Sequence, residues 1–166
     1  MIIVEYSIRP FEKKDLSFLW EMLYQSIYIP EGQQGPSREV LNEPNIEKYL
    51  KDWGRKHDHA LIALDAQNNP VGAIWFRLFN RENAGYGFVD ENTPELGMAV
   101  LSDHRGQGIG KRLLSKMISY AHSLGYSALS LSVVPDDKTA LHMYEKSGFE
   151  KVYQDDGGAW TMRKDL

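Results

Sequence analysis

The residues best suited to chemistry form one glycine-rich segment, residues 105–110, which reads Arg-Gly-Gln-Gly-Ile-Gly. Three glycines at alternate positions leave the backbone open to the close approach of a ligand. An amphipathic stretch follows at once, and the first amides of a helix have no partners within the helix, so that together with the helix dipole they attract anions. Arg105 and Lys111 add positive charge beside them. The pattern therefore predicts a site for a pyrophosphate.

Two other glycine-loop types fit this segment less well. The dinucleotide-binding pattern GxGxxG requires a glycine at position 111, where this chain has a lysine. The Walker loop requires Ser or Thr after its Gly-Lys pair, but Arg112 follows Gly110 and Lys111, and position 105 is not the glycine that would begin it.

The segment resembles motif A of the GNAT superfamily of N-acetyltransferases, Arg/Gln-x-x-Gly-x-Gly/Ala, through Arg105, Gly108 and Gly110. A second stretch, residues 140–149, reads ALHMYEKSGF and is similar to the family pattern A-x-x-x-Tyr-x-x-x-Gly-Phe. Two motifs in the right order are a far more specific signal than one glycine loop. The sequence motifs of the family are matched over residues 94–149. Before residue 94, only the order of strands and helices resembles the family.

The resemblance implies a fold and a set of cofactor contacts. It implies an α/β fold with a mixed sheet flanked by helices, in which two central strands splay apart and receive the pantetheine arm of acetyl-CoA. In this sequence the implied contacts are Met98, Ala99 and Val100 for the arm, and Arg105, Gly106, Gln107, Gly108, Ile109, Gly110 and Lys111 for the pyrophosphate. Asp137 stands where the family often has Asn, and it can cap the next helix or accept a hydrogen bond from the arm. No metal is implied.

Acetyl transfer to an amine requires one proton to leave the amine and another to reach the departing thiolate. By the resemblance, Tyr144 occupies the position of the residue that often serves the thiolate; otherwise it packs near Phe149. Glu95 opens the strand before the glycine loop and is the candidate base, because a suitable pocket raises a carboxyl pKa. Alternatively, Glu95 is a pocket-wall residue that orients the amine, and a chain of water molecules removes the amine proton.

The remaining polar and aromatic candidates carry weaker signals. The five histidines show no metal-ligand spacing. Arg77 suggests a surface ion pair or a contact with an acceptor carboxylate. The aromatic series in the middle of the chain predicts core or pocket wall; it comprises Trp75, Phe76, Phe79, Tyr86 and Phe88.

Hydrophobic periodicity predicts the elements that must position these residues. Strands are expected at 2–9, 60–64, 71–78, 96–101, 128–134, 150–153 and 159–162. Helices are expected from about 16 to 27, over 46–53 and over 138–147, and residues 106–124 are expected to form a glycine-rich turn that runs into a helix. The segments 30–44 and 80–92 are expected loops, and 155–158 a hairpin turn. Strands interleaved with helices predict an α/β sandwich.

Composition bounds the class of protein. The length of 166 residues predicts one domain over 1–166. The absence of cysteine argues against thiol chemistry, and the net charge of −4 argues against nucleic acid as a partner. No signal peptide and no membrane-spanning run is expected, so the predicted location is cytoplasmic.

The sequence thus predicts an N-acetyltransferase that moves an acetyl group from acetyl-CoA directly to a primary amine. Direct transfer is favoured because there is no cysteine and no serine in a nucleophile elbow. An acyl-CoA-binding sensor without catalysis is the alternative, and a mononucleotide-binding protein is a third reading. The acceptor stays open between a polyamine, an antibiotic, an amino acid and a protein N-terminus. A homodimer through the final hairpin is a further possibility.

Overall fold

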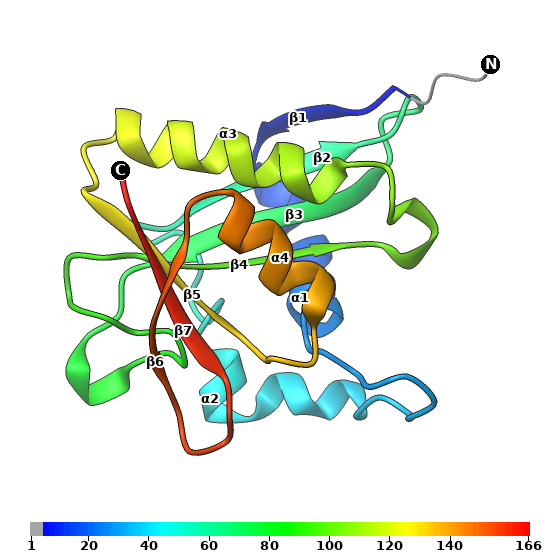
Figure 1. Ribbon diagram of the computed structural model, residues 1–166. Coiled ribbons are helices and arrows are strands. Elements are labelled where there is room, and N and C mark those ends of the chain that lie inside the picture. Colours follow the sequence, from blue (N-terminus) through cyan, green and yellow to red (C-terminus); the bar gives the residue numbers. More distant parts are fainter. Residues whose placement is uncertain (1–4) are drawn as a thin grey trace.

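The protein is built on one seven-stranded sheet in the order β1-β2-β3-β4-β5-β7-β6 (Figure 1). The computed structural model describes residues 5–166. The strands are β1 (Ser7–Pro10), β2 (His59–Leu64), β3 (Pro70–Arg77), β4 (Glu95–Val100), β5 (Ala128–Val133), β6 (Glu150–Gln154) and β7 (Trp160–Asp165). The α-helices are α1 (Leu16–Gln25), α2 (Pro44–Glu47), α3 (Ile109–Ser123) and α4 (Lys138–Lys146).

At the centre of the sheet, β4 and β5 form the only parallel pair among the described strands. β1 to β4 pair antiparallel, and so do β5, β7 and β6, whereas β4 and β5 run parallel and share the single ladder pair Glu95↔Ser130. Beyond that pair the two strands diverge (Figure 1). The α/β class with a mixed sheet and a splayed central strand pair, predicted from the sequence, is thereby confirmed.

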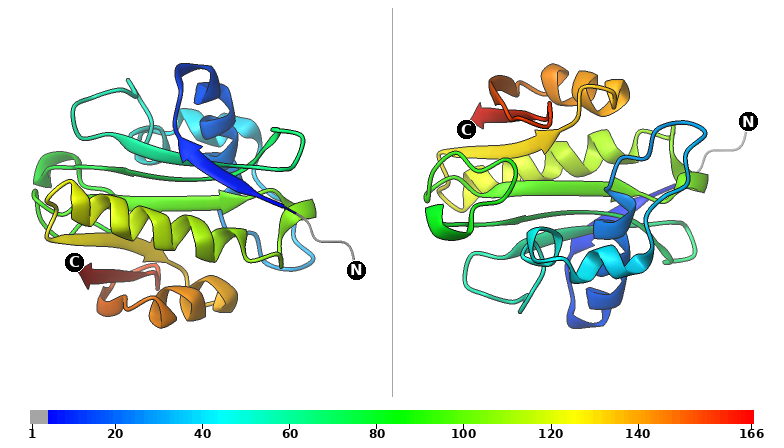
Figure 2. Two further views of the ribbon diagram at one scale, coloured as in Figure 1. Left: turned by 90° about the horizontal axis from the view of Figure 1, so that it is seen from above. Right: turned by 90° about the horizontal axis from the view of Figure 1, so that it is seen from below.

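The helices cover both faces of the sheet (Figure 2). One face packs on α3 and α4, and its core includes Leu113, Met117 and Tyr144. The other face packs on α1 and the turn after α2, and its core includes Leu19, Leu50 and Trp75. Because both faces are covered, β2 and β3 are almost continuously buried, which explains their uninterrupted apolar sequences. No helix over residues 5–166 is long and apolar enough to span a membrane.

Most predicted elements are present, with shifted ends. β1 begins at Ser7, and residues 2–4 of its predicted range lie outside the described part. Within 106–124 the predicted glycine-rich turn comes first and α3 begins at Ile109, because Gly106 and Gly108 have φ values of 79° and 80°. Such left-handed backbone favours glycine and does not continue a right-handed helix.

The helix predicted over 46–53 is wrong in extent, since α2 ends at Glu47 and a turn follows. The Arg77 guanidinium donates Nη1 hydrogen bonds to the carbonyls of Lys48 (2.9 Å) and Lys51 (2.7 Å). Those carbonyls would accept from later amides if the helix continued. Asp52 then takes a left-handed φ of 56°, which ends the turn.

The C-terminal hairpin closes one side of the sheet. β6 and β7 pair across the predicted turn at 155–158, where Asp155 Oδ1 accepts from the Ala159 amide at 2.9 Å. β6 is an edge strand, and all five of its residues are exposed.

Candidate functional site

A pocket of about 1020 Å³ lies where β4 and β5 separate. β4 lines it from Glu95 to Val100, and residues 132–134 of β5 and the turn after it line it opposite. The glycine loop closes one end, and residues 23–29, from the end of α1 onward, form a further wall. The splay that the parallel junction creates is therefore the space in which a ligand can enter the sheet.

The glycine loop presents a row of free amides to this pocket. A Cβ built at Gly106 or Gly108 would meet no atom within 4 Å, so the space beside the loop is open. The amides of residues 106–111 donate no hydrogen bond to another residue in the described part of the chain; the first helical bond runs from the Arg112 amide to the Gly108 carbonyl. Free amides at the start of a 15-residue helix form an anion site.

The pocket brings together all but one of the predicted site residues. Gln107 does not line it, whereas twelve do: Glu95, Met98, Ala99, Val100, Arg105, Gly106, Gly108, Ile109, Gly110, Lys111, Asp137 and Tyr144. The Ile109 side chain is buried in the core, so a ligand there could contact only its backbone.

Besides Glu95, described below, two of these side chains have protein partners. Arg105 Nε donates to the Val100 carbonyl at 3.0 Å and so ties the loop to the end of β4. Asp137 is the N-cap of α4, because its Oδ1 accepts from the Ala140 amide at 3.3 Å.

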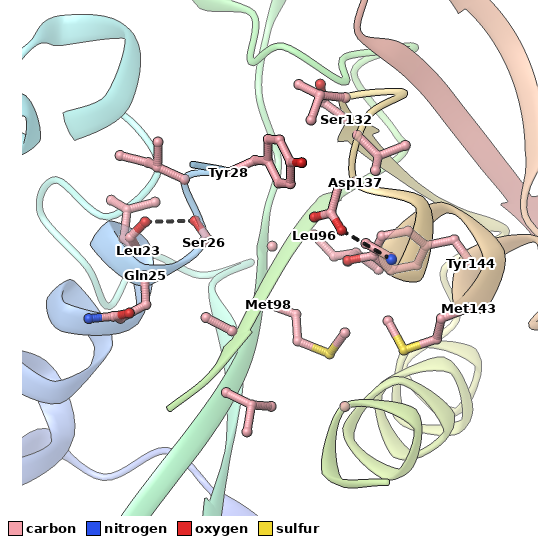
Figure 3. A pocket seen from close by; sticks show the side chains of 18 of the residues that line it. Leu23, Gln25, Ser26, Tyr28, Leu96, Met98, Ser132, Asp137, Met143 and Tyr144 are labelled. Carbon is pink, nitrogen blue, oxygen red and sulfur yellow. Dashed lines mark hydrogen bonds between the residues drawn. The ribbon is translucent and has the colours of Figure 1, made fainter. Parts of the chain in front are cut away.

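Two methionines line the gap between β4 and α4. Figure 3 shows the side chains of Met98 and Met143 pointing toward one another below Tyr144. A Cβ at Gly110 would lie 3.6 Å from Met143 Sδ and 3.6 Å from Met98 Cε, so α3 approaches both side chains closely here. This part of the pocket is apolar and adaptable, as unbranched methionine side chains permit.

Tyr144 reaches the pocket from α4 (Figure 3). It is 7% exposed, and its ring packs edge-on against Phe149 with 5.9 Å between centroids. Its hydroxyl makes no hydrogen bond to another described residue. Burial, and next the charge of Asp137, raises the pKa of the Tyr144 hydroxyl above its ordinary value, so this group stays protonated at neutral pH.

Glu95 lies at the point where the strands separate and is only 2% exposed. Residues 85–87 cover its carboxyl group, since a Cβ at Gly85 would meet Glu95 Oε1 at 2.2 Å. Oε1 has no hydrogen-bond partner among the described residues, whereas Oε2 accepts from Tyr49 Oη at 2.6 Å. Burial raises the pKa of Glu95 to about 7, although the hydrogen bond from Tyr49 partly opposes the rise.

Tyr49 is a pocket residue that the sequence did not reveal as part of the site. Its hydroxyl accepts from the Tyr86 amide at 2.7 Å and donates to Glu95, so it connects the covering loop to the carboxyl group. Burial and the charge of Glu95 raise the pKa of Tyr49 well above its ordinary value. Tyr49 lies 37 residues before Tyr86 and 46 before Glu95, and no local pattern links it to them.

Arg77 has neither of its predicted roles. It is 2% exposed and forms a buried ion pair with Asp58, at 2.7 Å between Nη2 and Oδ2. It therefore cannot contact an acceptor carboxylate. The predicted ion pair is present, but it is buried and not at the surface. Its bonds to the carbonyls of Lys48 and Lys51 bracket Tyr49 and fix that residue beneath Glu95.

The remaining candidates lie outside any catalytic arrangement. His104 lines the pocket beside the loop and is bonded through Nδ1 to Tyr6 Oη at 3.0 Å. Trp75, Phe76 and Phe79 are core residues and Tyr86 is exposed, and both Trp75 and Tyr86 line the pocket, as the prediction of core or pocket wall allowed. No group of three His, Asp or Glu side chains within residues 5–166 is placed to hold a metal ion.

The raised pKa of Glu95 predicts a pH-dependent stability. Unfolded glutamate ionises near pH 4.5, whereas the folded residue holds its proton to about pH 7. The parent therefore loses stability as the pH rises between these values, and Glu95→Gln escapes that loss. Urea unfolding should show the variant gaining about 2 kcal/mol relative to the parent between pH 5 and pH 8. Exposed Glu91→Gln is the control, and an equal gain in both variants would contradict the assignment.

Comparison with known proteins places the chain in a family. Residues 20–149 match the pattern described as the acetyltransferase (GNAT) family. A mycothiol acetyltransferase of Propionibacterium freudenreichii is 31% identical over 134 residues, which are 80% of this chain and 39% of that protein. An uncharacterized N-acetyltransferase of Methanocaldococcus jannaschii is 26% identical over 90% of this chain and 63% of its own length. The chain thus spans about two fifths to two thirds of these relatives.

The fold has solved counterparts. The GNAT domain of S. lividans PAT superposes with a TM-score of 0.72 at 15% identity, covering 99% of this chain and 95% of that one. This likeness concerns the fold alone, whereas the family pattern spans most of the sequence, including both motifs around the splayed strands. The chain therefore belongs to the acetyltransferase (GNAT) family.

Proposed function

We propose that this protein transfers an acetyl group from acetyl-CoA directly to a primary amine. The observation that carries the proposal is the splayed pair β4 and β5, with the free amides of residues 106–111 at one end and Glu95 at the other. The amides suit the pyrophosphate of CoA, and Lys111 adds positive charge. From Met98 to Val100, β4 pairs with no described strand on the side that faces β5, and this edge suits the amides of a pantetheine arm, apart from the Val100 carbonyl that accepts from Arg105.

The reaction needs two proton transfers, and the pocket holds a candidate group for each. The neutral amine attacks the thioester carbonyl carbon, a C–N bond forms and the C–S bond breaks. Tyr144 gives its proton to the departing thiolate, because its hydroxyl is protonated and faces the pocket. The amine proton leaves toward Tyr49 Oη, which passes its own proton to Glu95 Oε2. Solvent then restores both groups.

The donor can be tested without knowing the acceptor. Acetyl-CoA and CoA should each raise the melting temperature, because a ligand that binds only the folded state stabilises it. ATP, which has phosphates but no pantetheine arm, should raise it less. A shift with ATP and none with acetyl-CoA or CoA would favour a mononucleotide-binding protein and contradict the proposal.

Gly108→Val should weaken CoA binding by about tenfold to a hundredfold. Gly108 has a φ of 80° at the N-cap of α3, and a β-branched residue there costs about 1–2 kcal/mol and pushes the loop out of shape. The dissociation constant for CoA, measured by calorimetry, checks this expectation.

Gly125→Val is the matched control. Gly125 has a φ of 92° at the other end of α3, also with no atom near its Cβ position, and does not line the pocket. It should lose similar stability and keep the parent affinity for CoA. Parent affinity in Gly108→Val would place the pyrophosphate elsewhere.

A further inference from the structure

Half of the exposed large hydrophobic side chains of the described residues lie at the pocket. Eight such side chains are exposed within residues 5–166, and four of them line it: Tyr28, Ile29, Tyr86 and Val134. Tyr28, Ile29 and Tyr86 are 37%, 39% and 49% exposed. Exposed apolar side chains that gather at one cavity indicate that an apolar ligand covers them.

One side of the pocket carries no ionised side chain. Residues 23–29 read Leu-Tyr-Gln-Ser-Ile-Tyr-Ile, and Ile46, Tyr49 and Tyr86 extend this surface, which we name the aromatic wall. Figure 3 shows Tyr28 reaching from this wall into the space opposite Tyr144 and Asp137. The aromatic wall can therefore bury a ring or an alkyl body against tyrosine faces.

Of the three pocket carboxylates, Glu95 meets the aromatic wall through Tyr49, whereas Asp137 and Asp155 belong to the start of α4 and to the hairpin turn, and each accepts one hydrogen bond. Glu95 accepts from Tyr49, Asp137 caps α4, and Asp155 accepts from the Ala159 amide in the hairpin turn. A single ammonium group beside Glu95 suits this arrangement. The second and third ammonium groups of a polyamine would lie against the rest of the aromatic wall, where no carboxylate other than Glu95 is placed to receive them among the described pocket residues.

An acceptor carboxylate has no cation to meet on the aromatic wall. The basic lining residues His104, Arg105 and Lys111 all belong to the glycine loop and its flanks. Arg77 is held by Asp58 and does not line the pocket. Burying a free carboxylate against tyrosine and isoleucine side chains without a partner is costly.

We propose that the acceptor is an arylalkylamine: a single primary amine, an aromatic body held by Tyr28 and Tyr86, and no free carboxylate. This inference rests on the proposed acetyl transfer and adds its substrate class. Tyr28 is then a residue that determines specificity through its ring.

Four amines separate the features of the proposal when thiol release from acetyl-CoA is followed. Phenethylamine has one amine and a ring, phenylalanine adds a carboxylate, hexylamine replaces the ring by a chain, and spermidine adds further amines. The expected kcat/KM for phenethylamine exceeds those for phenylalanine and spermidine by at least about tenfold, with hexylamine between them.

Two variants of Tyr28 test the ring itself. Tyr28→Ala should lower kcat/KM for phenethylamine by roughly tenfold and for hexylamine less, whereas Tyr28→Phe should keep the parent values. Tyr153→Ala, on β6 and 45% exposed but outside the pocket, is the matched control and should change neither.

The outcomes distinguish the acceptor class from acetyl transfer. Phenylalanine or spermidine used as well as phenethylamine would overturn the acceptor class and leave acetyl transfer standing. An equal loss for all amines in Tyr28→Ala would also overturn it. No turnover of any amine, beside a normal CoA-induced rise in melting temperature, would overturn the transfer and this inference with it.

Discussion

Replacing Glu95 by glutamine should lower kcat/KM by on the order of 10²–10⁴-fold and remove one limb of the pH profile. In the parent, kcat/KM should rise with pH through the pKa of Glu95, about 7, because only the ionised carboxylate accepts the amine proton. Glutamine fills the same volume and can still accept from Tyr49, so the pocket keeps its shape. The titration of the amine itself, at higher pH, should remain in both proteins.

Tyr49→Phe distinguishes a proton relay from a structural contact. The hydrogen bond from Tyr49 lowers the pKa of Glu95 against the effect of burial, so its loss should move the limb to higher pH. The rate at the plateau should also fall, since the relay hydroxyl is gone. If Tyr49→Phe kept the pH profile of the parent, the proton relay would be contradicted. If Glu95→Gln kept the rise of kcat/KM near pH 7, a water chain would be the base instead of Glu95.

Tyr144→Phe should lower kcat by about 10²-fold, the lower end of general-acid effects, because a thiolate is a good leaving group. The affinity for CoA should hardly change, since the interaction matters mainly in the transition state. Phenylalanine keeps the edge-on packing against Phe149, so the fold is retained.

Single-turnover rates with saturating acetyl-CoA and a good acceptor check this effect where chemistry limits the rate. Tyr153→Phe, which removes a hydroxyl outside the pocket, is the control and should keep the parent rate. An unchanged kcat in Tyr144→Phe would show that Tyr144 serves only in packing. If the parent bound CoA but turned over none of many amines, an acyl-CoA-binding sensor without catalysis would be favoured.

The glycine loop and its neighbours could be predicted because their signals are local. The alternate glycines, the apolar spacing of α3 and the capping Asp137 each lie within a few residues of the feature they determine. The order of strands and helices followed from periodicity, and the splay followed from the family resemblance. These expectations needed no contact between distant parts of the chain.

The acid–base end of the pocket could not be predicted in the same way. Periodicity predicted a helix up to residue 53, but hydrogen bonds from Arg77 of β3 to the carbonyls of Lys48 and Lys51 replace its last part by a turn. Tyr49 reaches Glu95 from this turn. The enclosure of Glu95 depends on the loop at 85–87, whose path has no periodic signal. Both features are tertiary contacts: Tyr49 lies 46 residues before Glu95, and the loop at 85–87 folds back over Glu95 without a regular element between them.

Initial-rate kinetics with product identification would show whether the protein transfers the acetyl group of acetyl-CoA directly to an amine. Acetyl-CoA and phenethylamine are varied together, free thiol is followed, and the acetylated amine is quantified by mass spectrometry. We expect one thiol released per N-acetyl product and intersecting double-reciprocal lines, because both substrates occupy the splayed pocket before reaction. Parallel lines, or thiol release without acetylated amine, would contradict it.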